Sequence, residues 1–285
     1  MNKRLSFFLI QELGRRSNQE DTIYPSIADT QFVEGLFILC DGMGGHASGE
    51  LASQLVCATL SEAVFENRRE DGFFEMADFN KALNVAYDAL DAHDYEEEKK
   101  MGTTLAFARF HKGGCFIAHI GDSRIYHIRP SEHKCMYVTR DHSLVNDLVE
   151  LGELTPQEAR YSARKNIITR AMQPHQDHRA KADTYNITDL KVDDILFLCS
   201  DGMLETIDDQ QLLDYLSAPV SDEEKVREMR EATATNQDNH SAILIHLLDD
   251  DRQNNNGHLI KKNKHLVLII IASLILIIAL IILFK

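Results

Sequence analysis

Gly35-Leu-Phe-Ile-Leu-Cys-Asp-Gly-Met-Gly-Gly-His-Ala-Ser-Gly-Glu50 is the stretch that decides the fold of this chain. Its apolar run, Leu36 to Cys40, predicts a fully buried strand, and the run stops at a carboxylate followed by glycines. Asp41 is therefore expected at the edge of a core, where a charge is costly unless a basic group or a metal ion meets it. Because no Lys or Arg occurs between Arg16 and Arg68, the sequence offers no local basic partner.

The same arrangement occurs again far downstream. Ile195-Leu-Phe-Leu-Cys-Ser200 predicts a second buried strand, and Asp201-Gly202-Met203 follows it directly. Asp-Gly is also common in ordinary turns, so one copy alone would favour a simple strand-to-turn junction. Two copies on strands this hydrophobic, in a chain with further acidic turns, favour a shared cation.

Length and composition narrow the class of protein. The 285 residues suffice for one large domain with an appendage, and 45 acidic against 30 basic residues give a net charge of −15. That charge argues against a nucleic-acid binder, whose affinity rests on phosphate neutralisation. Five cysteines without paired spacing predict buried thiols in a reducing compartment rather than a disulfide framework. The apolar part of the N-terminus is too short for a signal peptide.

The last part of the chain predicts a membrane anchor. Residues 266–284 carry no charge and are rich in Leu and Ile, and as a helix they would span roughly 28 Å, about the thickness of the hydrocarbon core. Lys261, Lys262 and Lys264 precede this segment, which places the N-terminal part in the cytoplasm by the positive-inside tendency. We therefore expect a single-pass, C-terminally anchored protein of the cell membrane, with residues 249–265 as a polar and basic linker.

Hydrophobic periodicity predicts an α+β domain over residues 1–248. Strands occur in runs linked by glycine turns rather than alternating with helices, which indicates antiparallel sheets covered by helical layers. The expected strands cover residues 7–11, 36–40, 103–110, 115–120, 124–128, 136–139, 182–187, 195–200 and 241–248. The expected helices cover residues 50–66, 78–100, 141–165, 208–216 and 222–232, with a capping box at Thr155-Pro-Gln-Glu158.

Six carboxylates lie in predicted turns next to strands: Glu20, Asp21, Asp41, Asp122, Asp201 and Asp238. All-oxygen acidic sites without Cys or paired His suit Mg²⁺ or Mn²⁺ rather than zinc. The set is too large for one ion, and two ions about 3.5 to 4 Å apart sharing a water are used for in-line attack on phosphorus. Arg16 lies in the same loop as Glu20, where its guanidinium could bind phosphate oxygens.

Rival chemistries can be tested on the sequence. A cysteine phosphatase needs an arginine six positions after its cysteine. The residues six positions after the five cysteines are His46, Ala63, Gly121, Asp141 and Glu205, so this class is excluded. Residues 42–47 match a dinucleotide-binding glycine pattern, but the charge of Asp41 would point at the pyrophosphate and no βαβ alternation follows. The chain also has no P-loop Gly-Lys-Ser/Thr and no Gly-x-Ser-x-Gly.

Eight short motifs in order resemble the metal-dependent protein phosphatase family, the type 2C serine/threonine phosphatases, in their bacterial form. They are Arg16-Ser-Asn-Gln-Glu-Asp21, Asp41-Gly-Met-Gly-Gly-His-Ala-Ser-Gly-Glu50, Met101-Gly-Thr-Thr104, Gly121-Asp-Ser-Arg124, Thr139-Arg-Asp-His-Ser143, Ile168-Thr-Arg-Ala-Met172, Ser200-Asp-Gly202 and Asp238-Asn239. The resemblance covers residues 6–248. It implies a four-layer αββα sandwich, that is, two antiparallel sheets flanked by helices on both sides.

The resemblance also implies a role for each site residue. Asp41 would bridge two Mn²⁺ or Mg²⁺ ions, with the carbonyl of Gly42 as a further ligand. The remaining ligands would be Asp201 and Asp238 on one ion and Glu20 on the other, with Asp21 supporting the cluster. Arg16 would bind the substrate phosphate.

Further implications concern a third ion and the flap. Asp122, with Asp201, resembles the acidic pair that holds a third, weaker metal in bacterial members, although Asp122 could equally cap a hairpin turn. Residues 141–170 correspond to the flap beside the active site. Met43 stands where eukaryotic members have a histidine proposed as general acid, so no general acid is assigned, and His46 reads as a turn or cap residue.

Five other residues in the motifs are interpreted as structural. Arg124 and Arg170 are expected to pair with carboxylates, and His142 to pack or hydrogen-bond. Thr104, with Thr103, is expected to hold the neighbouring turn.

Three functional hypotheses follow. The first is an active phosphatase, tethered to the membrane, that acts on phosphoserine and phosphothreonine in proteins, with a Ser/Thr kinase as its functional opponent. The second is a pseudoenzyme of the same fold, disfavoured because every expected metal carboxylate is present. The third is an oxidoreductase that binds a nicotinamide cofactor at the glycine turn.

Overall fold

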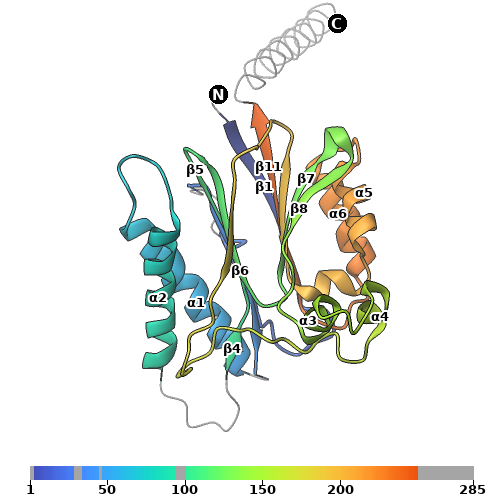
Figure 1. Cartoon of the computed structure of the whole chain (residues 1–285). Helices are drawn as coiled ribbons and strands as arrows, with labels where there is room; N and C mark the ends of the chain where they lie inside the picture. The colour runs from blue at the N-terminus through green and yellow to red at the C-terminus, as the bar shows by residue number, and fades with distance from the viewer. Residues whose placement is uncertain (1–2, 29–33, 45–46, 94–100, 250–285) are drawn as a thin grey trace, which may run out of the picture. The chain divides into compact units, whose positions relative to one another are not determined.

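Two β-sheets lie face to face at the centre of the computed structural model, which describes residues 3–28, 34–44, 47–93 and 101–249 (Figure 1). Residues 5–247 form one compact unit, and the fold below is that unit's. From the second unit the structure describes only residues 3–4 and 248–249, which belong to the first and last strands.

The first sheet has five strands in the order β1-β11-β10-β7-β8. The bounds are β1 (Lys3–Glu12), β7 (Arg124–Arg129), β8 (Lys134–Val138), β10 (Ile195–Cys199) and β11 (His240–Asp249). The central strand β10 pairs in antiparallel fashion with both β11 and β7. Its five residues are all buried, as expected for the apolar run that ends at Ser200.

The second sheet has the order β2-β3-β5-β6-β9, with the short strand β4 also paired to β3. The bounds are β2 (Asp21–Tyr24), β3 (Leu36–Met43), β4 (Gly102–Thr103), β5 (Leu105–His111), β6 (Gly114–Ile120) and β9 (Asp183–Ile187). Strand β3 changes partners along its length: residues 36–39 pair with β5, whereas Gly42 and Met43 pair with β4.

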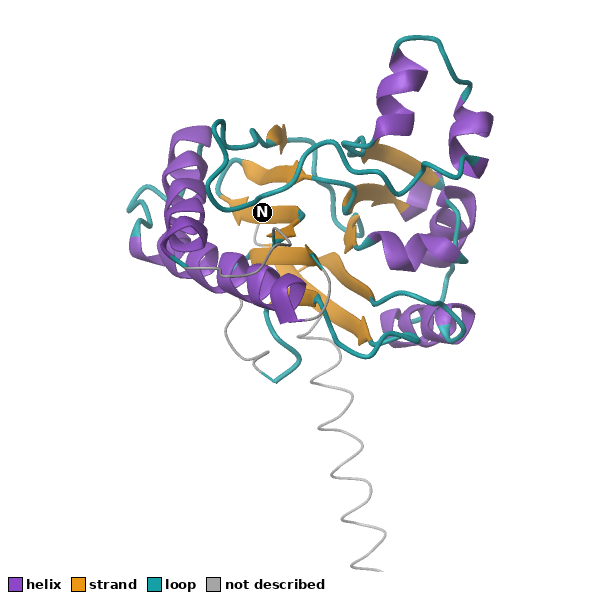
Figure 2. Cartoon of the chain, turned by 90° about the horizontal axis from the view of Figure 1, so that it is seen from below, coloured by secondary structure: helices purple, strands orange, loops and turns teal. Residues whose placement is uncertain are grey.

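Helices cover the outer faces of both sheets, as Figure 2 shows from below. The two long helices α1 (Ala47–Glu66) and α2 (Met76–Ala92) lie on the second sheet. The helices α5 (Asp209–Ser217) and α6 (Asp222–Thr233) lie on the first sheet. Shorter helices are α3 (Leu144–Glu150), α4 (Pro156–Tyr161), η1 (Pro130–Glu132) and η2 (Asp201–Glu205).

Three apolar clusters fill the spaces between these layers. Strand β3 shows why the central layer is buried on both sides: Leu36 and Ile38 pack toward α1 and α2, whereas Phe37 and Leu39 pack between the sheets. The third cluster joins β10 and β11 to α5 and α6. A strand buried on both faces reads as a continuous apolar run, which is the pattern seen in the sequence.

The four-layer αββα sandwich predicted from the sequence is confirmed. Two local predictions were wrong. Asp21 begins strand β2 instead of lying in a turn, and residues 141–165 form only α3 and α4 rather than one helical stretch. The capping box at Thr155 and Glu158 is present at the start of α4.

Within the described part of the chain, no helix has the length and apolar character needed to cross a membrane. The predicted membrane segment 266–284 and nearly all of the preceding linker lie outside the described residues.

Candidate metal centre

Asp21 and Asp41 stand opposite each other where β2 pairs with β3. The backbone of Asp41 is held by two neighbouring threonines. Its N–H donates to the hydroxyl of Thr104 at 3.0 Å, and its carbonyl accepts from the Thr104 N–H at 2.9 Å and the Thr103 hydroxyl at 3.0 Å. The end of β3 is therefore fixed on both sides, and Asp41 is partly exposed at that end.

The end of β10 supplies the next carboxylate. Asp201 opens the helix η2, close enough to Asp41 for its charge to raise the pKa of that carboxyl. The preceding Ser200 donates its hydroxyl to Asp21 Oδ2 at 2.9 Å and accepts the N–H of Ser241 at 2.9 Å. The two sheets are therefore joined at this point through one serine.

A glycine allows η2 to approach the start of β11. A Cβ built on Gly202 would lie 2.0 Å from the carbonyl oxygen of Asn239, so only glycine fits there. Asn236 reinforces this contact by donating its amide to the carbonyl of Gly202 at 2.6 Å. Asp238 and Asp201 are therefore brought to the same place from strands β11 and β10.

Residues 13–20 close the site from the other side. Asn239 accepts the N–H of Glu20 at 2.8 Å and donates its own amide to the carbonyl of Leu13 at 2.8 Å. Arg16 Nη2 lies 2.6 Å from Asp238 Oδ2, with the arginine side chain 55% exposed. The structure thus places the predicted phosphate-binding arginine next to a predicted metal ligand.

Gly42 packs against the loop of Glu20. Its N–H donates to the carbonyl of Glu20 at 3.0 Å, and an added Cβ would lie 2.1 Å from the carbonyl oxygen of Gly49 in α1. The last part of β3 therefore needs a glycine for close packing. His46 lies outside the described residues.

The turn of Asp122 is tied to the same site. Ser123 next to it shares a 2.7 Å hydrogen bond with the hydroxyl of Thr104, which holds Asp41. His142 accepts the N–H of Gly121 through Nδ1 at 3.0 Å and donates its own backbone N–H to the carbonyl of Gly121 at 2.9 Å.

Arg124 and Arg170 act as carboxylate partners, as the sequence analysis expected. Arg124 forms two 2.7 Å hydrogen bonds with Asp141, and Arg170 lies 2.9 Å from Asp183. They stabilise loops beside the carboxylate cluster.

The carboxylates raise one another's pKa values. Burial is the main cause for Asp41, whose pKa lies well above its usual value, and the charges of Asp21, Asp201 and Asp122 add to it. Burial likewise raises the pKa of Asp21 to about 7, against the hydrogen bond that it accepts from Ser200. Burial with the nearby charge of Asp238 raises that of Asp201 to about 6. So many acids held together are unfavourable as ions unless a cation lies among them.

Two buried oxygen atoms show that the site fits a metal ion. Among the described residues, Asp21 Oδ1 and Asp122 Oδ1 are buried and have no hydrogen-bond donor. Burying a carboxylate oxygen unpaired is costly, so such atoms indicate a cation. The surrounding donor set is carboxylate oxygen, which suits hard Mg²⁺ or Mn²⁺ ions.

A second group of possible ligands is His119, His142 and Asp183. Arg170 already occupies this place as a cation, because its Nη1 lies 2.9 Å from Asp183 and 3.2 Å from His142 Nε2. His142 uses its other ring nitrogen on Gly121, so the group is a hydrogen-bonded network rather than a metal site.

The dinucleotide-binding hypothesis does not fit this geometry. Strand β3 pairs in antiparallel fashion with β2, β4 and β5, so its glycine turn does not belong to a βαβ unit.

Four residues that hold the cluster were not predicted from the sequence to do so. They lie in or beside the motifs, and at most a structural role was expected of them. They are Thr104, Ser200, Asn239 and Ser241. The sequence offered only one indication of their role: each lies within three residues of a site carboxylate, or of a residue that pairs with the strand carrying one.

Comparisons with known proteins all indicate the same family. A family model described as protein phosphatase 2C matches residues 14–242. The serine/threonine protein phosphatase PstP of Mycobacterium tuberculosis is 34% identical over 206 residues, which is 72% of this chain and 37% of that protein. Protein phosphatase PhpP of Streptococcus pneumoniae is 30% identical over 243 residues, covering 84% of this chain and 96% of PhpP. The chain thus spans little more than a third of the mycobacterial relative's length.

Solved structures agree in fold. The crystal structure of the M. tuberculosis phosphatase PstP superposes with a TM-score of 0.72 at 30% identity, covering 86% of this chain and 99% of that one. The catalytic domain of PstP in complex with two manganese ions gives a TM-score of 0.70 at 30% identity, covering 87% and 100%.

Proposed function

Because the chain belongs to the protein phosphatase 2C family, we propose that it is a metal-dependent protein serine/threonine phosphatase acting on phosphoserine and phosphothreonine. One observation carries this proposal: carboxylates from five separate strand ends and turns lie close enough to act on one another's charge, and buried oxygens of Asp21 and Asp122 lack any donor among the described residues. The two manganese ions in the PstP domain support the choice of Mn²⁺ or Mg²⁺.

Each residue has a proposed part in the reaction. Bound ions would supply positive charge and a water of lowered pKa as the nucleophile. Asp41, at the end of β3 where the charge of Asp201 also acts on it, would be the ligand that both ions share. Asp201, Asp238, Glu20 and the carbonyl of Gly42 would complete their coordination, Asp21 would support the cluster, and Asp122 with Asp201 would hold a third ion.

Arg16 would hold the phosphate of the substrate. Its side chain is exposed beside Asp238, so part of its guanidinium remains directed to solvent over the cluster. A guanidinium binds two phosphate oxygens in a fork, which orients the phosphorus for attack. Met43 carries no proton that could be donated to the leaving group, so no general acid is assigned.

Phosphate release from a phosphothreonine peptide tests this proposal. The full chain should require Mn²⁺ or Mg²⁺ and lose activity in chelator. Asp201→Asn should lower kcat at least roughly 100-fold, because it removes a ligand charge worth several kcal/mol in such sites. Asp214→Asn, an exposed carboxylate paired with His133, is the matched control and should retain activity.

Two other results would favour the alternative hypotheses. A folded chain without phosphate release under any metal would favour the pseudoenzyme hypothesis, and NAD binding by the pure chain would favour the oxidoreductase hypothesis.

We further propose that residues 266–284 anchor the phosphatase in the cell membrane, with residues 1–248 in the cytoplasm. Support comes from the sequence alone: an uncharged Leu/Ile-rich segment preceded by three lysines. Its substrates would be phosphoproteins modified by an opposing Ser/Thr kinase. Extraction tests the anchor: the full chain should resist carbonate washing of membranes, whereas a chain ending at Asp249 should be released. Equal release of both would contradict it.

A further inference from the structure

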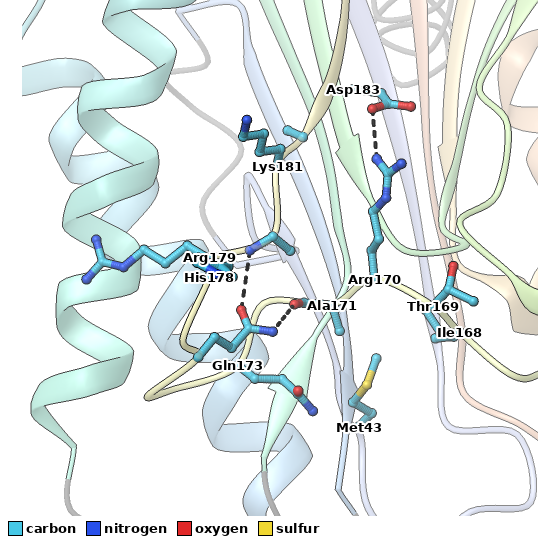
Figure 3. Close-up of a pocket in the computed structure, with 13 residues that line it drawn as sticks. Met43, Ile168, Thr169, Arg170, Ala171, Gln173, His178, Arg179, Lys181 and Asp183 are labelled. Carbon is cyan, nitrogen blue, oxygen red and sulfur yellow. Dashed lines mark hydrogen bonds and ion pairs between the residues drawn. The ribbon is translucent and has the colours of Figure 1, made fainter.

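A cavity of about 750 Å³ is lined mainly by residues 168–183 (Figure 3). This segment leads from the flap to strand β9, and Met43 at the end of β3 completes the wall. The cavity takes no part in the proposed metal chemistry, because none of the predicted metal ligands lines it.

Backbone hydrogen bonds join this cavity to the metal centre. Met172, within the lining segment, forms a bridge with Thr103 in which each N–H donates to the other's carbonyl at 2.9 Å. The hydroxyl of Thr103 in turn donates to the carbonyl of Asp41. Met43 is two residues beyond Asp41 on the same strand. A peptide whose phosphate is held over the cluster would therefore have its neighbouring residues within reach of the cavity.

The cavity is basic in a chain whose net charge is −15. Its lining includes three cations, Arg170, Arg179 and Lys181, against one carboxylate, Asp183. That carboxylate is already paired with Arg170 at 2.9 Å.

The partners of the remaining cations differ. Arg179 lies over the ring of Tyr87 and pairs with Asp88 at 2.5 Å and Asp91 at 2.7 Å, both on α2. Figure 3 shows its side chain directed away from Arg170, toward that helix. Lys181 is exposed, and among the described residues no carboxylate lies within ion-pair distance of its ammonium group. Lys181 is thus the cation in the lining that is left to bind an incoming anion.

We propose that this cavity is a substrate subsite that binds an acidic side chain flanking the phosphorylated residue, with Lys181 as its main contact. The proposal rests on the proposed phosphatase function and adds a substrate class to it: phosphoproteins with Glu or Asp near the phosphorylated Ser or Thr. A contact with an exposed lysine contributes more to selectivity than to tight binding, since charge complementarity mainly excludes wrong partners.

Two phosphothreonine peptides, one with glutamates and one with glutamines at the flanking positions, test the subsite in the full chain with Mn²⁺. The wild type should show a higher kcat/KM for the glutamate peptide. Lys181→Gln should lower that preference about fivefold, the change made by about 1 kcal/mol for an exposed ion pair. Lys181→Glu should reverse it. Lys134→Gln, an exposed lysine on β8 outside the cavity, should keep the wild-type preference.

Two results would overturn the subsite: equal kcat/KM for both peptides in the wild type, or a preference that Lys181→Gln and Lys181→Glu leave intact. A third peptide with a second phosphate in place of the glutamates separates carboxylate recognition from phosphate recognition, and a preference for that peptide alone would also overturn the proposal.

Failure of the proposed function can be recognised separately. The wild type should hydrolyse p-nitrophenyl phosphate, which has no flanking residues, and no hydrolysis with any metal would contradict the phosphatase itself. Binding of the two peptides, measured by fluorescence anisotropy, would then still decide the subsite: equal affinity would overturn it, and tighter binding of the glutamate peptide that Lys181→Gln abolishes would support it.

Discussion

Asp21 and Asp194 are both buried carboxylates, yet their surroundings move their pKa values in opposite directions. Burial raises that of Asp21 to about 7, and one of its oxygens has no donor among the described residues. Burial acts on Asp194 too, but hydrogen bonds from His127, Arg129 and the backbone N–H of Lys191 outweigh it, so the pKa of Asp194 lies well below its usual value. The first environment needs a cation, whereas the second already contains one.

Arg16→Ala should raise the KM for a phosphothreonine peptide about tenfold, because it removes a charge-assisted hydrogen bond to phosphate. Arg16→Lys should give a KM between those of the wild type and Arg16→Ala, since lysine keeps the charge but cannot bind two phosphate oxygens at once. Steady-state kinetics of both variants checks this. Arg15→Ala, an exposed neighbour, is the control and should behave as the wild type. An unchanged KM in both Arg16 variants would show that Arg16 does not bind phosphate.

Asp194→Asn should lower the free energy of unfolding by roughly 3–5 kcal/mol, because it removes the one buried carboxylate, among the described residues, that pairs with the buried guanidinium of Arg129. The second carboxylate on Arg129 provides the comparison: Asp189 is 74% exposed, and Asp189→Asn should cost less than about 1 kcal/mol. Urea unfolding measures both. Similar losses for the two variants would mean that burial of the pair does not matter.

The lowered pKa of Asp194 predicts how the stability from this pair depends on pH. A carboxylate with a lowered pKa in the folded state stabilises the fold above the pKa of the unfolded chain, about 3.9, and loses that contribution as the pH falls through the folded value. The difference in unfolding free energy between wild type and Asp194→Asn should therefore be constant above about pH 5 and shrink below about pH 4. A constant difference down to pH 2 would contradict this.

Strand ends and the turns after them are the elements that build the site. Strands β3 and β10 each deliver an aspartate to the cluster because the apolar run stops there, and β11 starts two residues after Asp238. Glycines make the approach possible, since the backbone of Gly42 in β3 lies against that of Gly49 in α1, and the backbone of Gly202 in η2 lies against that of Asn239. The chemistry of the site therefore depends on backbone packing as much as on the carboxylates.

Gly202→Ala should abolish most metal-dependent activity and cost about 1–3 kcal/mol of stability, because its Cβ would lie 2.0 Å from the carbonyl oxygen of Asn239 and displace Asp201 from Asp238. Gly72→Ala is the control. Its Cβ would meet only Lys112 at 3.9 Å, but its φ of +74° disfavours alanine, so it should lose about 1 kcal/mol and keep full activity. Phosphate release with thermal unfolding separates the two effects, and an active Gly202→Ala chain would contradict the packing argument.

The flap shows the limit of periodicity at the scale of an element. Residues 141–165 have helical spacing, yet only α3 and α4 form, with residues 151–155 between them. Backbone contacts between the two ends of the flap decide this: the backbone N–H of Leu144 donates to the carbonyl of Ile167, and Ser143 forms a bridge with Ile168. Local propensity is a weak guide where such tertiary contacts compete.

For the whole molecule, the repulsion within the carboxylate cluster couples metal binding to stability. Mn²⁺ at about 100 times its Kd should raise the free energy of unfolding by about 2.7 kcal/mol, and chelator should remove the gain. Asp201→Asn should show a smaller rise, since one ligand is lost. Differential scanning fluorimetry with Mn²⁺, Mg²⁺ and EDTA measures the shift. Identical melting temperatures with and without metal would indicate that the cluster binds no ion.

The sequence by itself determined the αββα fold and the family, and it identified the carboxylates that the structure brings together. It could do so because these properties are local: an apolar run sets a buried strand, a carboxylate at its end marks the rim of the core, and short motifs keep their order. The assignment of those carboxylates as metal ligands remains a prediction.

Only the tertiary structure decided how the carboxylates are held and what surrounds them. Ser200 bonds Asp21 across 179 residues of sequence, and Asn239 holds Glu20 across 219. Such contacts depend on strand register and on the packing of two sheets, which no local pattern encodes. The same reason applies to the basic cavity: whether a lysine is paired is set by which carboxylates the fold places around it, and for Lys181 the described part of the chain places none within reach.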